Sequence, residues 1–585
     1  MKSLFNFFQL NKSVGVFSIL LFFFFFYNTF NNYGSNDIIR SDGDGYYSYL
    51  PAIFIYNDAS YASCVKAQRK EIVSDYKPLY IHKTKSGKNY NKFFPGVAVL
   101  QSPVFAFAYF TSWLKGGDSN GYSKGFQIFF YLGSIFYAFL GLIFFFKSLR
   151  LFFPKNKKEV NLVTIATYIA TPLFLYISEM PSFSHLYSFT LFGFFTYSLL
   201  KIKQKQTTRR IFIFAIIIGL IFIVRPTNLL IILTIPFLLG DLNNFKSFLN
   251  RLFQSKGLQF FVGVLGFSIV ASIIFILWKW QTGNWIAWSY TGEGFNFLNS
   301  KIIDNLFSFR VGLFVHTPLL ILSIFGCIIW FKKNSFAATS WLIYFFINLW
   351  VIASWWCWDY ETPFGNRPFT EHLFFFAFPL VHFAIKYYKT TVLFSVLFSV
   401  LSLIRTQQFN SGNHVNQRFT SANYFKSMMF WNEKNKDRWQ FTLSPIPFGK
   451  MIKQDVLLDQ KEIINIDSDT EFALTCRQKF IENRTNERLY IRIELDKKIT
   501  TTPLRNIFLV MDSKQLEGSE YEYQAIELFN DRYEGLNEWS HLIIERQVYD
   551  YMQELDMIAL YIWNKDGSEI QLKNVKFTLE TYKAD

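Results

Sequence analysis

Two carboxylates stand two residues apart where the first long apolar run of the chain ends. The segment reads Ile39-Arg-Ser-Asp-Gly-Asp-Gly-Tyr-Tyr47, so that a glycine separates Asp42 from Asp44. A carboxylate at a membrane surface can act as a general base on an acceptor hydroxyl, and Tyr46 and Tyr47 are suited to stacking on a sugar ring. An Asp-Gly turn in which either acid caps a helix explains the same residues.

Three arginines form a second chemical group. Arg225 begins the segment Arg-Pro-Thr-Asn, Arg310 stands before Val-Gly-Leu, and Arg367 follows Gly-Asn. Arginine makes bidentate contacts to phosphate, and an ionisable residue near the membrane is costly and often functional. Snorkelling to lipid phosphates accounts for each arginine alone. With the neighbouring acids and tryptophans, the three together are explained as well by a binding site for a phosphate or diphosphate head group as by snorkelling.

The remaining polar residues of these segments are interpreted as substrate-binding: Glu179, His185, Glu293, Trp356, Asp359, Glu361 and Glu371. Apolar residues flank His185 and also His316, and a histidine in such a setting is more often a satisfied core residue than a ligand. The four cysteines are few and widely spaced, so neither a metal-ligand pattern nor a disulfide framework is predicted. We expect no required cofactor, although Asp42 and Asp44 have the oxygen ligands that would hold a divalent ion.

The composition indicates where these residues lie. The chain is 51% hydrophobic and only 17% charged, which is typical of an integral membrane protein. Long apolar runs end near residue 405, so we predict a membrane domain over 1–405, a linker over 406–429 and a β-rich soluble domain over 430–585. About eleven spans are predicted, near 13–30, 126–147, 161–178, 182–200, 211–225, 226–240, 258–280, 311–331, 338–356, 370–386 and 391–405.

Charge sets the predicted orientation. Lys and Arg cluster in alternate connections and at the N-terminus, and the positive-inside rule places these in the cytoplasm. The net charge of +16 is thereby explained without nucleic acid. Segment 94–114 is apolar enough to span, but counting it would invert every later loop, so we interpret it as an interfacial or re-entrant helix. The candidate residues and the C-terminal domain then share the outer face. Residue usage indicates a bacterial inner membrane with a periplasmic tail.

The tail alternates in strand-like fashion, as in Arg488-Leu-Tyr-Ile-Arg-Ile-Glu-Leu495. About seven such segments predict a β-sandwich. Two roles stay open for it: holding a glycan acceptor, or acting as a structural cap.

The membrane part resembles the C-type (GT-C) superfamily of membrane glycosyltransferases, which includes protein mannosyltransferases and aminoarabinose transferases of lipid A. The resemblance covers roughly residues 10–405. It rests, in order, on Ser41-Asp-Gly-Asp-Gly-Tyr-Tyr47, Phe93-Phe-Pro-Gly-Val-Ala-Val-Leu100, Pro181-Ser-Phe-Ser-His-Leu-Tyr-Ser-Phe189 and Phe364-Gly-Asn-Arg-Pro-Phe-Thr-Glu371.

This resemblance implies transfer of a sugar from a polyprenyl-phosphate donor to a glycan, lipid or protein acceptor, with the first acid as base. Family members often place an aromatic residue four positions after that acid, which favours Asp42 with Tyr46. The usual family pair is an adjacent Asp-Glu, and the Asp-Gly-Asp found here departs from it. A lipid-linked glycan polymerase or ligase would share the same pattern. A transporter or flippase of a lipid-linked glycan would predict internal repeats, and no clear repeat is present.

Overall fold

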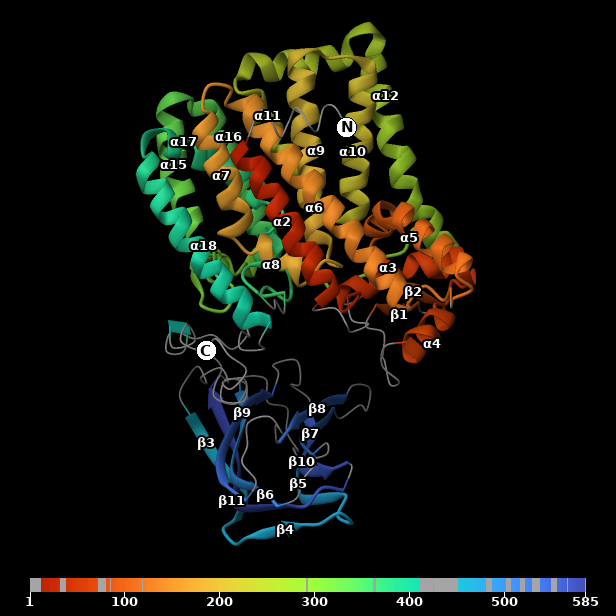
Figure 1. The fold of residues 1–585 in the computed structure, drawn as a ribbon, viewed down its shortest axis with the longest axis vertical. Helices are drawn as coiled ribbons and strands as arrows, with labels where there is room; N and C mark the ends of the chain where they lie inside the picture. The colour runs from red at the N-terminus through yellow and green to blue at the C-terminus, as the bar shows by residue number, and fades with distance from the viewer. Residues whose placement is uncertain are drawn as a thin grey trace. The chain divides into compact units, whose positions relative to one another are not determined.

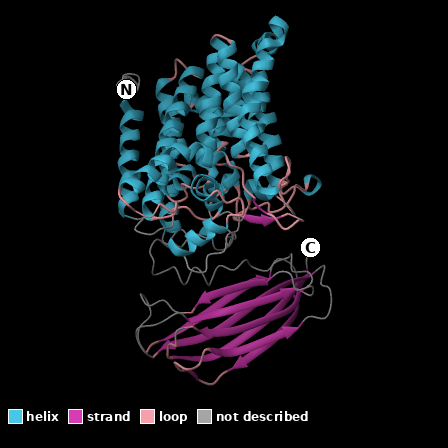
Figure 2. Ribbon diagram, turned by 90° about the vertical axis from the view of Figure 1, so that its right-hand side faces the viewer, coloured by secondary structure: helices cyan, strands magenta, loops and turns pink. Residues whose placement is uncertain are grey.

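The computed structural model describes residues 12–31, 38–71, 80–84, 86–117, 119–290, 293–360, 364–410, 424–425, 451–479, 487–500, 507–515, 521–528, 537–548, 555–565 and 567–583. The chain divides into two compact units, residues 1–406 and 407–585. The described residues are mainly helical in the first and mainly in strands in the second, as the sequence predicts (Figure 1, Figure 2). Residues 406–410 continue the last helix, and most of the predicted linker lies outside the described residues.

The helical unit is a bundle in which α9, α10 and α12 run side by side (Figure 1). Its helices and its one hairpin are α2 (Lys12–Asn31), α3 (Asp42–Pro51), η1 (Ala52–Tyr56), α4 (Ala62–Glu71), β1 (Ile81–Lys83), β2 (Asn89–Asn91), α5 (Gly96–Leu114), α6 (Lys124–Phe152), α7 (Lys157–Ile169), α8 (Leu173–Ser178), α9 (Ser184–Gln204), α10 (Thr208–Val224), η2 (Pro226–Thr234), α11 (Ile235–Leu239), α12 (Leu242–Thr282), η3 (Phe297–Asn299), α13 (Ile302–Phe307), α14 (Leu313–His316), α15 (Leu319–Lys333), α16 (Ser335–Ala353), η4 (Arg367–Phe369), α17 (Leu373–Lys386) and α18 (Tyr388–Asn410).

Among the described residues, five helices are long and apolar enough to cross a membrane: Gly96–Leu114, Lys124–Phe152, Lys256–Thr282, Ser335–Ala353 and Tyr388–Phe409. This is the make-up of an integral membrane protein. The number of eleven spans stays a prediction, and so does the interfacial placement of segment 94–114, which forms one helix, α5, with Pro103 inside it.

Proline divides several of the predicted spans. The run 161–178 becomes α7 and α8 with a break before Pro172, and the run 311–331 becomes α14 and α15 with a break before Pro318. Proline removes a helical hydrogen bond and disfavours helical geometry in the residue before it. Pro226 acts in the same way after α10, where the 3₁₀ helix η2 continues for nine residues, although 3₁₀ runs seldom exceed four.

The helices pack closely where glycine removes a side chain. A Cβ built on Gly326 of α15 would lie 1.9 Å from the carbonyl oxygen of Pro379 in α17, and such close approach is typical of membrane helices. We therefore expect Gly326→Ala to lower the free energy of unfolding by about 1–3 kcal/mol. Gly125→Ala in α6 is the matched control, because nothing lies within 4 Å of its added Cβ. Equal thermal midpoints for both variants in one detergent would contradict the expectation.

The second unit is a sandwich of antiparallel sheets, as predicted. One sheet has the order β5-β10-β7-β8, and the other has the order β3-β11-β6-β9 with β4 paired to β11. Inward side chains of both sheets, including Ile493, Leu509, Leu560 and Phe577, form a single core. The strands are β3 (Met451–Gln460), β4 (Ile464–Ile466), β5 (Phe472–Lys479), β6 (Glu487–Ile499), β7 (Ile507–Gln515), β8 (Tyr521–Glu527), β9 (Trp539–Val548), β10 (Leu555–Asn564) and β11 (Ile570–Lys583).

Candidate active site

The first acid of the Asp-Gly-Asp segment begins helix α3. Ser41 before it has a φ of 53°, which is uncommon for a residue with a side chain. Gly43, the residue after Asp42, lies close to the turn before α9. A Cβ built on it would come within 2.1 Å of the Ser182 hydroxyl. The tight entry and the glycine together hold the start of α3 against this turn.

Helical geometry separates the two acids. Positions 42 and 44 are about 200° apart around a helix, whereas positions 42 and 46 share a face. Accordingly, Asp42 and Tyr46 line the same cavity, and Asp44 does not. The Asp44 side chain is buried, and its Oδ1 accepts a hydrogen bond of 3.3 Å from Gln68. Tyr47 is also absent from the cavity lining, because its ring packs against Phe105 and Phe130 and its hydroxyl donates to the Gly121 carbonyl.

Asp42 is joined to an arginine far along the chain. Its Oδ2 lies 2.9 Å from Nη1 of Arg367, and the two side chains are 27% and 14% exposed. Burial lowers the pKa of Arg367, but the Asp42 carboxylate together with Tyr176 and Tyr46 outweighs burial, so the pKa rises and the guanidinium stays charged. The guanidinium also lies over the ring of Phe183, 5.4 Å from its centroid. Its Nε has no hydrogen-bond partner among the described residues.

The cavity that Asp42 lines has a volume of about 580 Å³, within the range of small-molecule sites. Its charged lining consists of Asp42, Lys92, Arg225, Glu293 and Arg367. Most of the rest is aromatic, including Phe93, Phe94, Phe222, Trp278, Trp288, Tyr290, Phe295, Trp355, Trp356 and Tyr360. Three cations and two carboxylates thus share one largely aromatic cavity.

Tyr46 also lines this cavity. Burial, and then the charge of Asp42, raise its pKa to about 12. The hydroxyl therefore keeps its proton at neutral pH and is available as a hydrogen-bond donor.

Arg225 forms an ion pair with the buried carboxylate of Glu371. Pro226 follows Arg225, and Arg225 is extended with a φ of −160° where α10 ends. Its Nη1 lies 3.3 Å from Oε1 of Glu371, which has no solvent exposure. Oε2 of Glu371 lies 2.6 Å from Nδ1 of His185, and because a carboxylate only accepts, Nδ1 carries the proton. Asn228 donates to Oε1 of Glu371 over 3.3 Å. Glu371 therefore positions Arg225, and neither Glu371 nor His185 lines the cavity.

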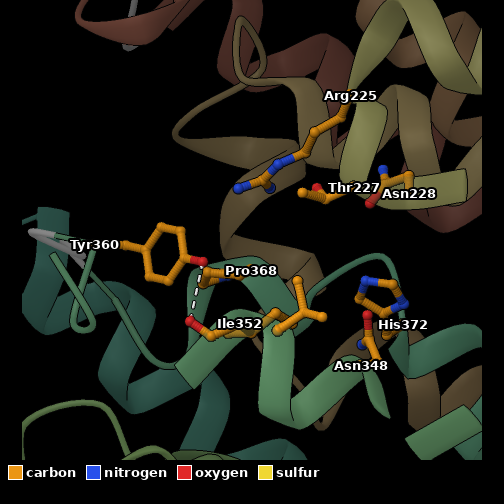
Figure 3. A pocket seen from close by; sticks show the side chains of 9 residues that line it. Arg225, Thr227, Asn228, Asn348, Ile352, Tyr360, Pro368 and His372 are labelled. Atoms are coloured by element: carbon orange, nitrogen blue, oxygen red, sulfur yellow. Dashed lines mark hydrogen bonds between the residues drawn. The ribbon is translucent and has the colours of Figure 1, made fainter. Parts of the chain in front are cut away.

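A narrow recess shares lining residues with the cavity, and Figure 3 shows the side chains that line the recess. Its volume of about 10 Å³ is that of one water-sized group. Arg225, Thr227 and Tyr360 border both the recess and the cavity. On the other side, Figure 3 shows the His372 ring beside Asn348. The Tyr360 hydroxyl donates to the carbonyl of Ile352 over 3.1 Å, which fixes the wall between the two spaces.

The other predicted site residues lie apart from the cavity or outside the described chain. Arg310 forms an ion pair with Asp359 and lies 5.7 Å over Trp358, and neither Arg310 nor Asp359 lines the cavity. Glu179 is absent from the cavity lining, and its carbonyl accepts from Arg40. Glu361 lies outside the described residues. The structure thus brings two of the three predicted arginines to Asp42.

Sequence reasoning missed Lys92. This residue lines the cavity, forms an ion pair with Glu293, and has its ammonium 5.3 Å from the ring centroid of Tyr290. No sequence signal singles this residue out, because the same predicted outer loop, 31–125, also holds Lys66, Lys70, Lys77, Lys83, Lys85 and Lys88.

Comparison with known proteins gives distant structural likenesses. No protein-family model matches the chain, and no curated protein matches it. A solved structure, the arabinosyltransferase EmbB from Mycobacterium smegmatis, is similar with a TM-score of 0.35 and 10% sequence identity. The similarity covers 92% of this chain and 64% of EmbB, so this chain spans less than two thirds of that protein's length. This likeness is too distant to assign a family.

Proposed function

We propose that the protein is a membrane glycosyltransferase that moves a sugar from a polyprenyl-phosphate donor to an acceptor on the extracytoplasmic face. One observation carries the proposal. The carboxylate of Asp42 lies in a cavity of about 580 Å³ that also presents Lys92, Arg225 and Arg367. A base for an acceptor hydroxyl and cations for a phosphate are the two groups that such a transfer needs.

The chemistry follows from this placement. The acceptor oxygen forms a bond to the anomeric carbon of the sugar, and the bond from that carbon to the phosphate oxygen breaks. The hydroxyl proton goes to Asp42, and the electron pair of the broken bond leaves with the lipid phosphate. Cations that already face this charge stabilise it without reorganising. The aromatic lining provides faces on which the sugar ring stacks.

The ion pair between Asp42 and Arg367 gives the donor a role in preparing the base. Arg367 makes a hydrogen bond of 2.9 Å to Asp42 and lines the cavity. A donor phosphate that binds this guanidinium from the cavity competes with the carboxylate for positive charge. Asp42 then becomes more basic when the donor is in place, which couples donor binding to proton removal.

We propose that the reaction needs no bound metal ion. Lys92, Arg225 and Arg367 supply positive charge to the cavity. The two acids that would bind a divalent ion point to different places, since Asp44 bonds to Gln68.

The location that we propose is a bacterial inner membrane with residues 430–585 in the periplasm. There the β-sandwich either holds the acceptor or caps the enzyme, and full transfer by a chain lacking it would exclude acceptor binding.

The test is transfer by the purified full chain from a panel of labelled polyprenyl-phosphate sugars, with a membrane glycan extract as acceptor and with or without EDTA. We expect one donor to give product, with EDTA making no difference. Arg367→Gln should reduce transfer strongly, whereas Arg310→Gln, the matched control, replaces an ion-paired arginine outside the cavity and should not. Transfer from no donor by folded protein would contradict the proposal.

Two alternatives have distinct outcomes in the same panel. A lipid-linked glycan polymerase or ligase would use a lipid-linked oligosaccharide and not a single lipid-linked sugar. A transporter or flippase is favoured by one observation, the interruption of apolar segments at η2 and at α14, because broken helices are common in transporters. It would move a fluorescent lipid-linked sugar across a vesicle bilayer without forming a new glycosidic bond.

A further inference from the structure

The first part of α12, residues 242–255, is set apart from the helices on either side of it. Gly240 before it has a φ of 92°, and Lys256 and Gly257 after it have φ values of 60° and 75°. Left-handed residues of this kind change the direction of a chain. Trp278, which lines the cavity, lies about 33 Å further along the helix axis. Residues 242–255 therefore form a separate helical segment at the end of α12 that is remote from the cavity.

This segment has a fixed start and one packed face. The Oδ1 atom of Asp241 caps it by accepting a hydrogen bond of 2.7 Å from the backbone amide of Asn244. Phe245, Phe248 and Leu252 pack into the core of the helical unit, and their spacing of three and four residues places them on one side of a helix. The cap and this packing fix how the segment is rotated about its axis.

A second apolar side of the segment is exposed. Leu242, Leu249 and Phe253 are 46%, 37% and 59% exposed. Their spacing of seven and four residues places them together, next to the packed side. The opposite side is polar and exposed, and it consists of Asn243, Ser247, Asn250 and Gln254. The segment is thus amphipathic, and the bundle covers only part of its apolar face.

The charge of the segment is positive. Lys246, Arg251 and Lys256 are all exposed, and residues 242–256 contain neither Asp nor Glu. Lys246 borders the exposed apolar side, because it lies three residues before Leu249 and seven before Phe253. Apolar side chains with lysine beside them and no acid match the surface of a membrane that contains anionic lipid.

The exposed apolar side also adjoins a surface that faces a bilayer. Residues 256–282 are apolar enough to cross a membrane, and Leu258, Phe261 and Leu265 are exposed at their start. A bilayer that covers these side chains ends where the segment 242–255 begins. The segment is therefore placed at the depth of the lipid head groups.

We propose that residues 242–255 lie in the membrane surface on the side remote from the cavity and bind anionic phospholipid. Leu242, Leu249 and Phe253 insert among the acyl chains, and Lys246 and Lys256 contact the lipid phosphates. Anionic lipid thereby fixes one end of α12, whose other end carries Trp278 of the cavity. The inference rests on the direction, packing and charge of this segment and not on the transfer reaction.

The test is the environment of a fluorophore on Leu249→Cys, Phe253→Cys or Gln254→Cys, the last being the reference on the polar side. The full chain is placed in nanodiscs of phosphatidylcholine and phosphatidylglycerol, after replacement by alanine of Cys357 and Cys476, the free cysteines that are not fully buried. Lipids with brominated acyl chains quench from the bilayer, and iodide quenches from water.

We expect brominated lipid to quench the labels at positions 249 and 253, and iodide to quench the label at position 254. Iodide quenching at 249 and 253 equal to that at 254 would overturn the proposal, because this side of the helix would then face water. Protection of 249 and 253 from both quenchers would also overturn it, because a second copy of the chain or another protein would then cover them.

The choice of anionic lipid is tested with the same label at position 253. At equal mole fractions, brominated phosphatidylglycerol should quench more than brominated phosphatidylcholine, and Lys246→Gln with Lys256→Gln should make the two equal. Lys461→Gln with Lys479→Gln, the matched control, removes the same charge from exposed positions of the second unit and should keep the preference. Equal quenching by both lipids in the chain with its lysines intact would overturn the anionic partner. Failure of the transfer assay would not affect these results.

Discussion

Replacement of Asp42 by asparagine is expected to lower the rate of sugar transfer by about 10²–10⁴-fold. Asparagine has the shape of aspartate but cannot take the proton of the acceptor hydroxyl. The loss should appear in kcat at saturating donor, because Arg225, Arg367 and Lys92, the phosphate contacts of the proposed reaction, still line the cavity. The measurement is the initial rate of labelled product formation at several donor concentrations.

Asp44→Asn is the matched control for this prediction. It makes the same chemical change two residues away, at a buried position outside the cavity lining. Asparagine can still accept the hydrogen bond from Gln68, so transfer per folded molecule should stay close to wild type. An equal loss in both variants would indicate a shared structural role for the two acids. Unchanged transfer by Asp42→Asn would remove Asp42 as the base and return attention to Asp44 and Glu179.

The choice between the two acids shows what the sequence holds and what it does not. A helical period places positions 42 and 46 on one face and position 44 on another, so the position of Asp42 in the cavity lining follows once α3 is known to begin at Asp42. The sequence could not establish that start, because Asp-Gly-Asp-Gly is typical of a turn. Local structure, and not chemistry, was the missing step.

The pairing of distant residues could not be predicted. Asp42 meets Arg367 across 325 positions of the chain, and Glu371 meets His185 across 186. Each pair depends on how α3, α9 and α17 pack, and charge alone did not distinguish Arg367 from Arg310. In contrast, the β-rich tail was predicted from alternating side chains, a signal that is local to each strand. The broken spans carried their own signal in Pro172 and Pro318.

The contacts of Glu371 in the structure differ most from those that the sequence predicted. Its place in the Phe-Gly-Asn-Arg-Pro-Phe-Thr-Glu segment predicted contact with substrate, but its side chain is fully buried and accepts hydrogen bonds from His185, Arg225 and Asn228. A buried carboxylate costs free energy unless its partners supply charge and hydrogen bonds. Here every partner donates, so the carboxylate is held ionised and in turn holds Arg225 at the cavity wall.

Glu371→Gln is accordingly expected to lower the free energy of unfolding by about 3–5 kcal/mol, because it leaves the charge of Arg225 without its buried counterion. The amide also places a donor where the carboxylate accepted. The matched control is Glu159→Gln in the first turn of α7, which should lose about 0.3–1 kcal/mol through the helix dipole. Both variants are compared by thermal unfolding in one detergent.

The outcome of Glu371→Gln decides how the cavity obtains its positive charge. A large loss of stability together with weaker donor binding would show that the carboxylate both neutralises the charge of Arg225 and positions its side chain at the cavity. One buried group would then serve folding and phosphate recognition. Wild-type stability would mean that Arg225 is solvated from the cavity side and needs no counterion. Arg225 would then be free to move, and Arg367, fixed by Asp42, would be left as the ordered contact for the phosphate.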